Sequence, residues 1–270
     1  MKKAMYFLLI LIILSSISLF GAWSPVSQIE TETRYADASI VSAIATTEVY
    51  FTSRDIEERD TAGGAPAYDS TDGLSNACGP LAGAEIVAFY DKYYPDMIPN
   101  WNSYYPATGK YRIQNTTYIQ PLLYELYDLM QTNVNGEGVS ETEFKTGLQK
   151  YINKQGYSVS YTNVKSGSTL DYNSCKTAVN NNQVIVLFIT PGAVYDIVEY
   201  SDHDLIGSFN INGNHIMVAY GYLQIKYYDN SGLFRTDTYL KVATGLSLTS
   251  VAYYKLGSNN LEAAYIVNVS

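Results

Sequence analysis

The residue of this sequence best suited to covalent chemistry is Cys78, which begins the apolar run CGPLAGAEIVAFYDKYYP. This run has Pro80 in its first turn and stops before Pro95, a pattern that predicts a buried helix beginning at the cysteine. Unpaired N–H groups and the dipole at a helix N-terminus favour negative charge, and they lower the pKa of a thiol placed there. Gly79 lets a bound acyl group approach the backbone, and the N–H of Cys78 can donate to an oxyanion. Cys78 is therefore the predicted nucleophile.

The alternative to a nucleophile is a cysteine that is packed in the core and inert. This interpretation suits Cys175 better than Cys78. Cys175 lies in NSCKTAV, which has neither a following glycine nor a long apolar helix. Two cysteines exclude a disulfide-dense scaffold, so either they pair or at least one stays free. Because His203 and His215 are the only histidines, no zinc-ligand spacing occurs, and we expect neither a metal nor another cofactor.

The general base for the thiol is expected at His215, which opens a predicted strand in GNHIMVAYGY. A neutral imidazole can take the thiol proton and return it to a leaving amine when a third group fixes the ring. His203 lies between carboxylates in SDHD and is expected to be solvated or paired with one of them. The hairpin that follows His215 turns at residues 229–232, and its register brings Thr244 and Leu246 to the same face. The hydroxyl of Thr244 can accept from the ring N–H, so Thr244 is the predicted orienting residue.

Two segments resemble a known family. ACGPLAGAEIVAFYDKYYPDMIPN resembles the Cys-Gly-Pro segment of C39-like and related papain-like peptidases of exported bacterial proteins, and GNHIMVAYGY resembles their histidine strand. The two segments occur in the expected order, and the resemblance spans the chain from Cys78 to its end. It implies a papain-like fold and peptide-bond hydrolysis, with Cys78 as nucleophile and His215 as base.

The sequence departs from that family at two positions. YLKVATGLS resembles the segment of the orienting residue, but it has Thr244 where these families usually have Asn or Asp. Their oxyanion glutamine is replaced by Asp72, whose charge would repel an oxyanion, which leaves Ser75 or Asn76 as substitutes. Both departures bear on activity more than on fold.

The periodicity of apolar residues predicts helices first and strands later. Ser140 and Glu143 form a capping box, and the helices are expected at 78–94, 117–131, 140–155 and around 173–179. Strands are expected at 157–162, 183–190, 214–228, 233–244, 251–256 and 263–269. We therefore predict an α+β, papain-like fold in which an N-terminal helical half, with the cysteine helix, packs on a C-terminal antiparallel β-sheet that carries the histidine.

Residues 1–22 have the pattern of a signal peptide, with Lys2 and Lys3 before an apolar run without acidic residues. An uncleaved anchor is the alternative, because Phe20 is not the small residue that a cleavage site prefers. Residues 23–69 are polar and mixed, and we expect a lead-in segment or short pro-segment before a peptidase domain at 70–270. The predicted location is secreted, periplasmic or at the cell surface, without stable membrane insertion after cleavage.

The composition narrows the class of function. A net charge of −9 argues against nucleic-acid binding, and 27 tyrosines suit half-buried strands. The predicted function is an exported cysteine peptidase acting on a peptide or protein substrate. The alternatives are a catalytically inactive member of the fold that binds peptides or surface partners, a cell-wall peptide amidase with the same residues, and a structural surface protein. The sequence does not predict the oligomeric state.

Overall fold

The computed structural model describes residues 32–68, 74–101, 117–246 and 251–270, with the backbone alone at 40–44. Four helices lie in these residues: α2 (Cys78–Asp91), α3 (Ile119–Leu129), α4 (Glu141–Lys154) and α5 (Tyr172–Asn180). All four occur where the sequence predicts a helix. The expected start of the first at Cys78 is confirmed, and every residue of α2 is buried.

The predicted capping box of α4 is also present. The Glu143 N–H donates to the Ser140 hydroxyl (3.2 Å), and the Ser140 N–H donates to the Glu143 carboxylate (2.8 Å). Two otherwise unpaired backbone donors are satisfied in this way, which fixes the start of the helix. Gly156 follows the helix with a left-handed φ of 89°, as expected of the glycine that ends it.

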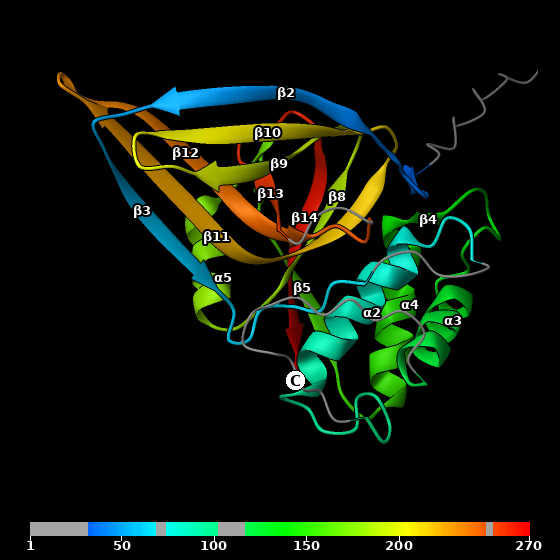
Figure 1. Ribbon diagram of the computed structural model, residues 1–270. Coiled ribbons are helices and arrows are strands. Elements are labelled where there is room, and N and C mark those ends of the chain that lie inside the picture. Colours follow the sequence, from blue (N-terminus) through cyan, green and yellow to red (C-terminus); the bar gives the residue numbers. More distant parts are fainter. Residues whose placement is uncertain (1–31, 69–73, 102–116, 247–250) are drawn as a thin grey trace, which may run out of the picture. The chain divides into compact units, whose positions relative to one another are not determined.

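A ten-stranded antiparallel sheet forms the rest of the molecule (Figure 1). Its strands, in chain order, are β2 (Ile40–Tyr50), β3 (Ser53–Asp60), β5 (Val159–Asn163), β8 (Ile185–Ile189), β9 (Gly192–Glu199), β10 (His203–Ile211), β11 (His215–Asp229), β12 (Gly232–Ala243), β13 (Ala252–Lys255) and β14 (Leu261–Val269). They lie in the order β2-β10-β9-β13-β12-β11-β8-β14-β5, and β3 also pairs with β11. Two short pairs lie outside this sheet, β1 (Arg34–Tyr35) with β4 (Val139–Ser140) and β6 (Lys165–Ser166) with β7 (Thr169–Leu170). The fold is thus α+β with a large antiparallel sheet, as predicted.

β11 is the strand that joins the two parts of this sheet. Its residues 215–219 pair with β8, its residues 221–228 pair with β3 along the same edge, and β12 lies along the other edge. His215 is the first residue of the strand, opposite Ile189 of β8. The histidine is therefore held in the interior of the sheet and not on a free edge.

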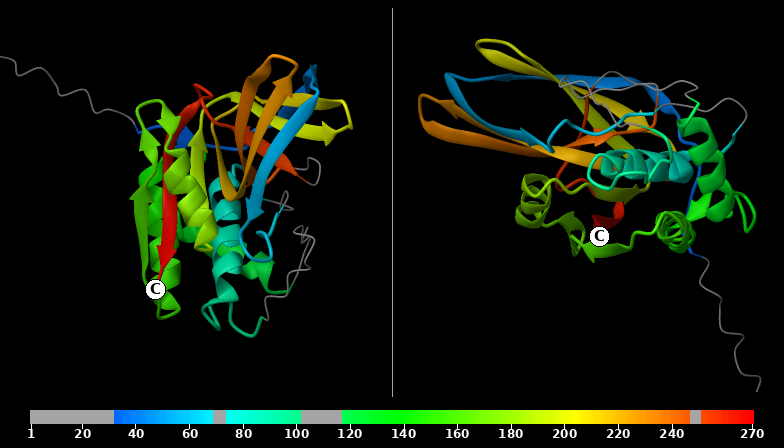
Figure 2. Two further views of the ribbon diagram at one scale, coloured as in Figure 1. Left: turned by 90° about the vertical axis from the view of Figure 1, so that its left-hand side faces the viewer. Right: turned by 90° about the horizontal axis from the view of Figure 1, so that it is seen from below.

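Helices cover both faces of the sheet around β8 and β11. Phe188 and Ile216 lie in the apolar core that includes α2, α3 and α4, whereas Leu187 and Met217 lie in the core that includes α5. Because successive side chains of a strand point to opposite faces, this alternation places α2–α4 on one face and α5 on the other (Figures 1 and 2).

The hairpin of β11 and β12 keeps the predicted register at both ends. Asp229 lies opposite Gly232 at the tip, and Val218 lies opposite Ala243 at the base. Two one-residue shifts, after Ala219 and after Tyr227, cancel each other. Extended from the base, this register brings the chain just beyond β12 next to His215.

The N-terminal part of the chain departs from the prediction. Residues 34–60, expected in a lead-in segment, form β1–β3, and β2 and β3 pair with β10 and β11. The compact unit therefore begins at Thr33 and not at 70. β3 is largely exposed and charged (SRDIEERD), so it lacks the apolar alternation by which a strand is predicted. β9 and β10 were not predicted for a similar reason, because polar residues interrupt them.

The predicted signal peptide at 1–22 lies outside the described residues. Within the described residues, no helix has the length and apolar character needed to cross a membrane.

Candidate active site

Cys78 lies at the N-terminus of α2 with 3% of its surface exposed. It is a free cysteine, as is Cys175, so the two do not form a disulfide. Cys175 lies within α5, fully buried in the apolar core on the other face of the sheet, as expected of a packed cysteine. Gly79 permits a close approach of β4 to the start of α2, because a Cβ at this position would lie 2.5 Å from Val139 Cγ2.

Three backbone N–H groups favour a negative charge on the Cys78 sulfur. They belong to Ile216, the residue after the histidine, and to Gly79 and Cys78 itself. Burial outweighs them, however, and raises the pKa of the thiol to about 12. The sequence predicted a lowered pKa from the helix N-terminus. The effect of the N–H groups is present, but in this closed arrangement the thiol is neutral at physiological pH.

His215 is 1% exposed, and its ring is held by one hydrogen bond. The ring Nε2 donates to the backbone carbonyl of Thr244 over 2.5 Å. A carbonyl oxygen can only accept, so Nε2 carries the proton and Nδ1 has the free lone pair. Nδ1 is buried and has no hydrogen-bond partner among the described residues. Burial also lowers the pKa of the imidazole, against the effects of the Thr244 carbonyl and a nearby carboxylate. The result is a neutral imidazole with a basic nitrogen at Nδ1.

Thr244 holds the histidine by a group other than the predicted one. The hydroxyl was expected to accept from the ring, but it bonds to Leu246 instead, accepting from its N–H (3.2 Å) and donating to its carbonyl (3.4 Å). The main-chain carbonyl, and not the side chain, therefore holds the ring. The next residue, Gly245, has a left-handed φ of 67°, and a Cβ there would lie 2.8 Å from Leu81 of α2. The turn after β12 thus packs closely on the cysteine helix.

Asp37 is a member of the site that the sequence did not predict. Its carboxylate accepts from the N–H of Asn76 (2.6 Å) and the N–H of Ala77 (2.8 Å), the two residues before the cysteine. The charge of Asp37 raises the pKa of the Cys78 thiol and that of the His215 imidazole. Burial is nevertheless the largest influence on each of these two pKa values. One carboxylate is therefore close enough to influence both candidate catalytic groups. Asp37 lies 40 residues before Ala77 in a polar stretch without a motif, so only the fold brings it here.

Residues 34–39, called the 34–39 segment below, bond to the residues that precede Cys78 through Asp37 and to those that precede His215. Arg34 also bonds to the Glu143 carboxylate of α4 and to the Gly138 carbonyl, both at 2.8 Å. On the side of His215, the Asn214 amide donates to the Arg34 carbonyl (2.9 Å), and the N–H of residue 39 donates to the side chain of residue 212 (2.8 Å). The segment therefore connects the cysteine helix to the histidine strand.

Asn76 and Ser75, the predicted substitutes for an oxyanion glutamine, use their side chains in other hydrogen bonds. The amide of Asn76 donates to Asn133 Oδ1 (2.9 Å), and the hydroxyl of Ser75 accepts from the Asn133 amide (3.5 Å). Asp72 lies outside the described residues. The N–H groups of Cys78 and Gly79 belong to the first turn of α2 and have no acceptor within the helix. Backbone donors are thus available, whereas the predicted substitute Asn76 already donates its amide to Asn133.

His203 is the first residue of β10, just after the turn that follows β9, and it lies opposite Tyr50 of β2. Its ring stacks on Tyr200, with ring centroids 4.5 Å apart, and on Tyr50 at 5.1 Å. Its Nδ1 is 2.8 Å from the carboxylate of Asp202. The expected pairing with a neighbouring carboxylate is confirmed.

Two features limit what the site can do as it stands. No hydrogen bond joins the thiol of Cys78 to Nδ1 of His215, and both groups are almost fully buried. The described residues contain no cluster of three or more side chains suited to a metal ion. Any reaction of the Cys78 thiol requires access from solvent.

Comparison with known proteins gives no relative: no protein-family model, no curated protein and no solved structure matches this chain.

Proposed function

We propose that the protein is a cysteine hydrolase that cleaves peptide bonds, with Cys78 as nucleophile and His215 as base. The observation that carries the proposal is the tautomer of His215 and the free lone pair that it leaves at Nδ1. The Thr244 carbonyl fixes the tautomer, and the resulting lone pair at Nδ1 is buried and unpartnered, one residue from the N–H that contacts the Cys78 sulfur. A buried polar nitrogen without a partner costs stability, and such costs are typical of functional sites.

The proposed reaction follows from these placements. Nδ1 takes the proton of the Cys78 thiol, and the sulfur attacks the carbonyl carbon of the scissile bond to give a tetrahedral oxyanion. The protonated Nδ1 then gives its proton to the leaving amine as the C–N bond breaks, which leaves a thioester on Cys78. Water, deprotonated by Nδ1, attacks the thioester, and the released thiolate takes the proton back. The N–H groups of Cys78 and Gly79 are the proposed donors to the oxyanion.

Substrate must first reach the buried thiol. We propose that the 34–39 segment moves away from Cys78 and His215 to admit it, because this segment bonds to both sides of the site. The thiol could then turn from the Ile216 N–H towards Nδ1. Exposure to solvent would also remove the main cause of the raised thiol pKa.

The same proposal includes the finer description of the fold. A cysteine at the start of a buried helix, a histidine at the start of a central antiparallel strand and a main-chain carbonyl beyond the next strand form a papain-like arrangement. The resemblance of the Cys-Gly-Pro and histidine segments supports it. Export by the N-terminal signal peptide belongs to the proposal as well.

A peptide-library cleavage screen on the purified protein tests the function. We expect discrete cleavage sites with the unaltered protein and with Cys175→Ala, and none with Cys78→Ala. Cell-wall stem peptides belong in the library, because an amidase with the same residues would cleave these and no ordinary peptides. Equal cleavage by the unaltered protein and Cys78→Ala would contradict the assignment of the nucleophile.

A catalytically inactive member of the fold that binds peptides is the second candidate. It is favoured by the absent bond between Cys78 and Nδ1 and by the thiol pKa of about 12. It predicts no cleavage by any form of the protein, together with peptide binding that is the same in Cys78→Ala. Equilibrium binding of the library peptides to both forms separates the two candidates.

A further inference from the structure

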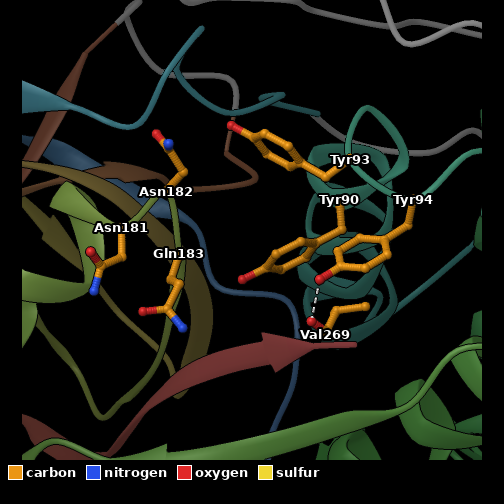
Figure 3. A pocket seen from close by; sticks show the side chains of 7 residues that line it. All are labelled: Tyr90, Tyr93, Tyr94, Asn181, Asn182, Gln183 and Val269. Carbon is orange, nitrogen blue, oxygen red and sulfur yellow. Dashed lines mark hydrogen bonds between the residues drawn. The ribbon is translucent and has the colours of Figure 1, made fainter.

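A cavity lies at the end of α2 that is opposite to the cysteine. It has a volume of about 340 Å³ and is lined by Tyr90 of α2, two tyrosines just after that helix (Tyr93 and Tyr94), three amide residues at 181–183 and Val269 of β14 (Figure 3). With a rise of 1.5 Å per residue, Tyr90 lies about 18 Å along the helix from Cys78. The volume is at the lower end of the range for small-molecule sites, about 300–1,000 Å³.

Two of the aromatic rings in this cavity are fixed. The Tyr90 hydroxyl donates to the Val267 carbonyl and the Tyr94 hydroxyl to the Val269 carbonyl, both over 2.5 Å (Figure 3 draws the second). The third ring, Tyr93, is 40% exposed, and the Lys92 ammonium lies 4.6 Å from its centroid. The cavity therefore has rigid aromatic walls and one accessible ring, an arrangement that loses little entropy when a ligand binds.

The amide side chains opposite these rings keep unused hydrogen-bonding groups. Asn182 accepts from the Ala62 N–H through Oδ1 (2.8 Å), which leaves its NH₂. Gln183 donates through Nε2 to Asn268, which leaves its oxygen. The amide of Asn181 makes no hydrogen bond to the described residues. The lining thus combines aromatic rings with amide donors and acceptors, and none of the described side chains that line the cavity is charged.

We propose that this cavity binds an uncharged saccharide. Sugar rings present C–H groups on their faces, which pack on aromatic rings, and hydroxyls at their edges that both donate and accept. Amide side chains match such hydroxyls, because each offers a donor and an acceptor without charge. A phosphate-bearing ligand does not fit, since no Lys or Arg lines the cavity and the chain carries a net charge of −9. This proposal is independent of the hydrolase proposal.

Saturation-transfer NMR with neutral oligosaccharides tests it. The probes are chitotriose, cellotriose and maltotriose, with a uronic-acid trisaccharide, adenosine and trialanine as comparisons, each up to about 10 mM, where even weak binding is detected. We expect at least one neutral saccharide to bind and the uronic acid not to bind. Failure of all three neutral saccharides, or preferred binding of adenosine or trialanine, would overturn the proposal.

Substitutions then locate the binding site. Tyr93→Ala removes the accessible ring and is expected to weaken saccharide binding by about tenfold, the scale of a lost aromatic contact. Asn181→Leu keeps the shape but removes the free amide, and a similar loss is expected. Tyr124→Ala, an exposed tyrosine on α3 outside the cavity, is the matched control and should bind as the unaltered protein does. Unchanged affinity in both cavity variants, with unchanged melting temperature, would place the saccharide elsewhere.

Discussion

The two cysteines of this protein have the same burial and very different neighbours. Burial raises the pKa of each thiol to about 12. Around Cys175 the other influences are the charge of Asp171 and its own backbone, and the packed groups are apolar. Cys78 adds the N–H groups of Ile216 and Gly79, and His215, the residue before Ile216, has an imidazole nitrogen with no partner among the described residues. Burial alone therefore does not distinguish the thiol of Cys175 from that of Cys78, whereas the polar groups around each thiol do.

The largest expected effect tests the role of the imidazole near Cys78. His215→Ala should lower kcat by about 10²–10⁴, the usual contribution of general acid–base catalysis, because it removes the proposed base. His203→Ala is the control and should keep full activity, since His203 lies at the start of β10 with its ring stacked between Tyr200 and Tyr50. The measurement is the rate of cleavage of a peptide found in the screen. Equal losses in the two variants would show that neither histidine is a specific base.

The second prediction concerns the cover over the site. In the double variant Arg34→Ala, Asp37→Ala, the 34–39 segment loses its bonds to Glu143 and to the N–H groups before Cys78. Iodoacetamide should then label Cys78 about ten- to a hundredfold faster, because local opening sets the rate at a buried thiol. Labelling of each cysteine is followed by mass spectrometry of the two peptides.

The matched control for that experiment is Lys176→Ala. This residue neighbours Cys175 and forms an ion pair with Glu57 between α5 and β3. It should leave the labelling of Cys78 unchanged. If the double variant accelerates both cysteines equally, it has loosened the whole fold, and the 34–39 segment is then no specific cover.

The third prediction compares how a serine at each cysteine position changes the free energy of unfolding. Cys175→Ser places a hydroxyl in an apolar core and should cost about 1–3 kcal/mol, the penalty of an unsatisfied buried polar group. Cys78→Ser should cost less, because its hydroxyl can accept from the Ile216 N–H. Urea unfolding of both variants measures the difference. An equal cost would mean that the polar groups around Cys78 are not positioned to bond to an oxygen.

The sequence predicted Cys78 and His215 as a pair, but it did not predict the groups that surround them, for physical reasons. The apolar run after Cys78 and the strand after His215 carry strong local patterns, and the hairpin register follows from its turn, so these could be predicted. The carbonyl of Thr244 could not be chosen over its hydroxyl, because every residue has a carbonyl and only the bend at Gly245 aims this one at the ring. No sequence pattern indicated that Asp37 belongs to the site. β2 and β3 lack the alternation of apolar residues by which strands are predicted, and the contact of Asp37 with Ala77 joins distant parts of the chain. The thiol pKa depends on burial, which a helix N-terminus does not reveal.

A fourth prediction uses the lowered pKa of His215. The folded protein holds this imidazole neutral, whereas an unfolded imidazole takes a proton below pH about 6.5. The unfolded state thus binds more protons below that pH, so the contribution to stability is present above about 6.5 and is lost as the pH falls. The drop in melting temperature between pH 7.5 and pH 5 should be smaller in His215→Gln than in the unaltered protein. An identical drop would mean that this imidazole is protonated in the fold.

The smallest expected effect separates the carbonyl of Thr244 from its side chain. Thr244→Val keeps the carbonyl that accepts from Nε2 and removes only the hydroxyl bonds to Leu246. We expect kcat to stay within about twofold and stability to fall by about 0.5–1.5 kcal/mol, the usual net value of a hydrogen bond. Cleavage rate and urea unfolding are measured on the same preparation. If kcat fell as far as in His215→Ala with little change in stability, the hydroxyl would orient the ring in the open site. The difference between Cys78 and Cys175 would then rest on a side chain and not on the backbone beyond β12.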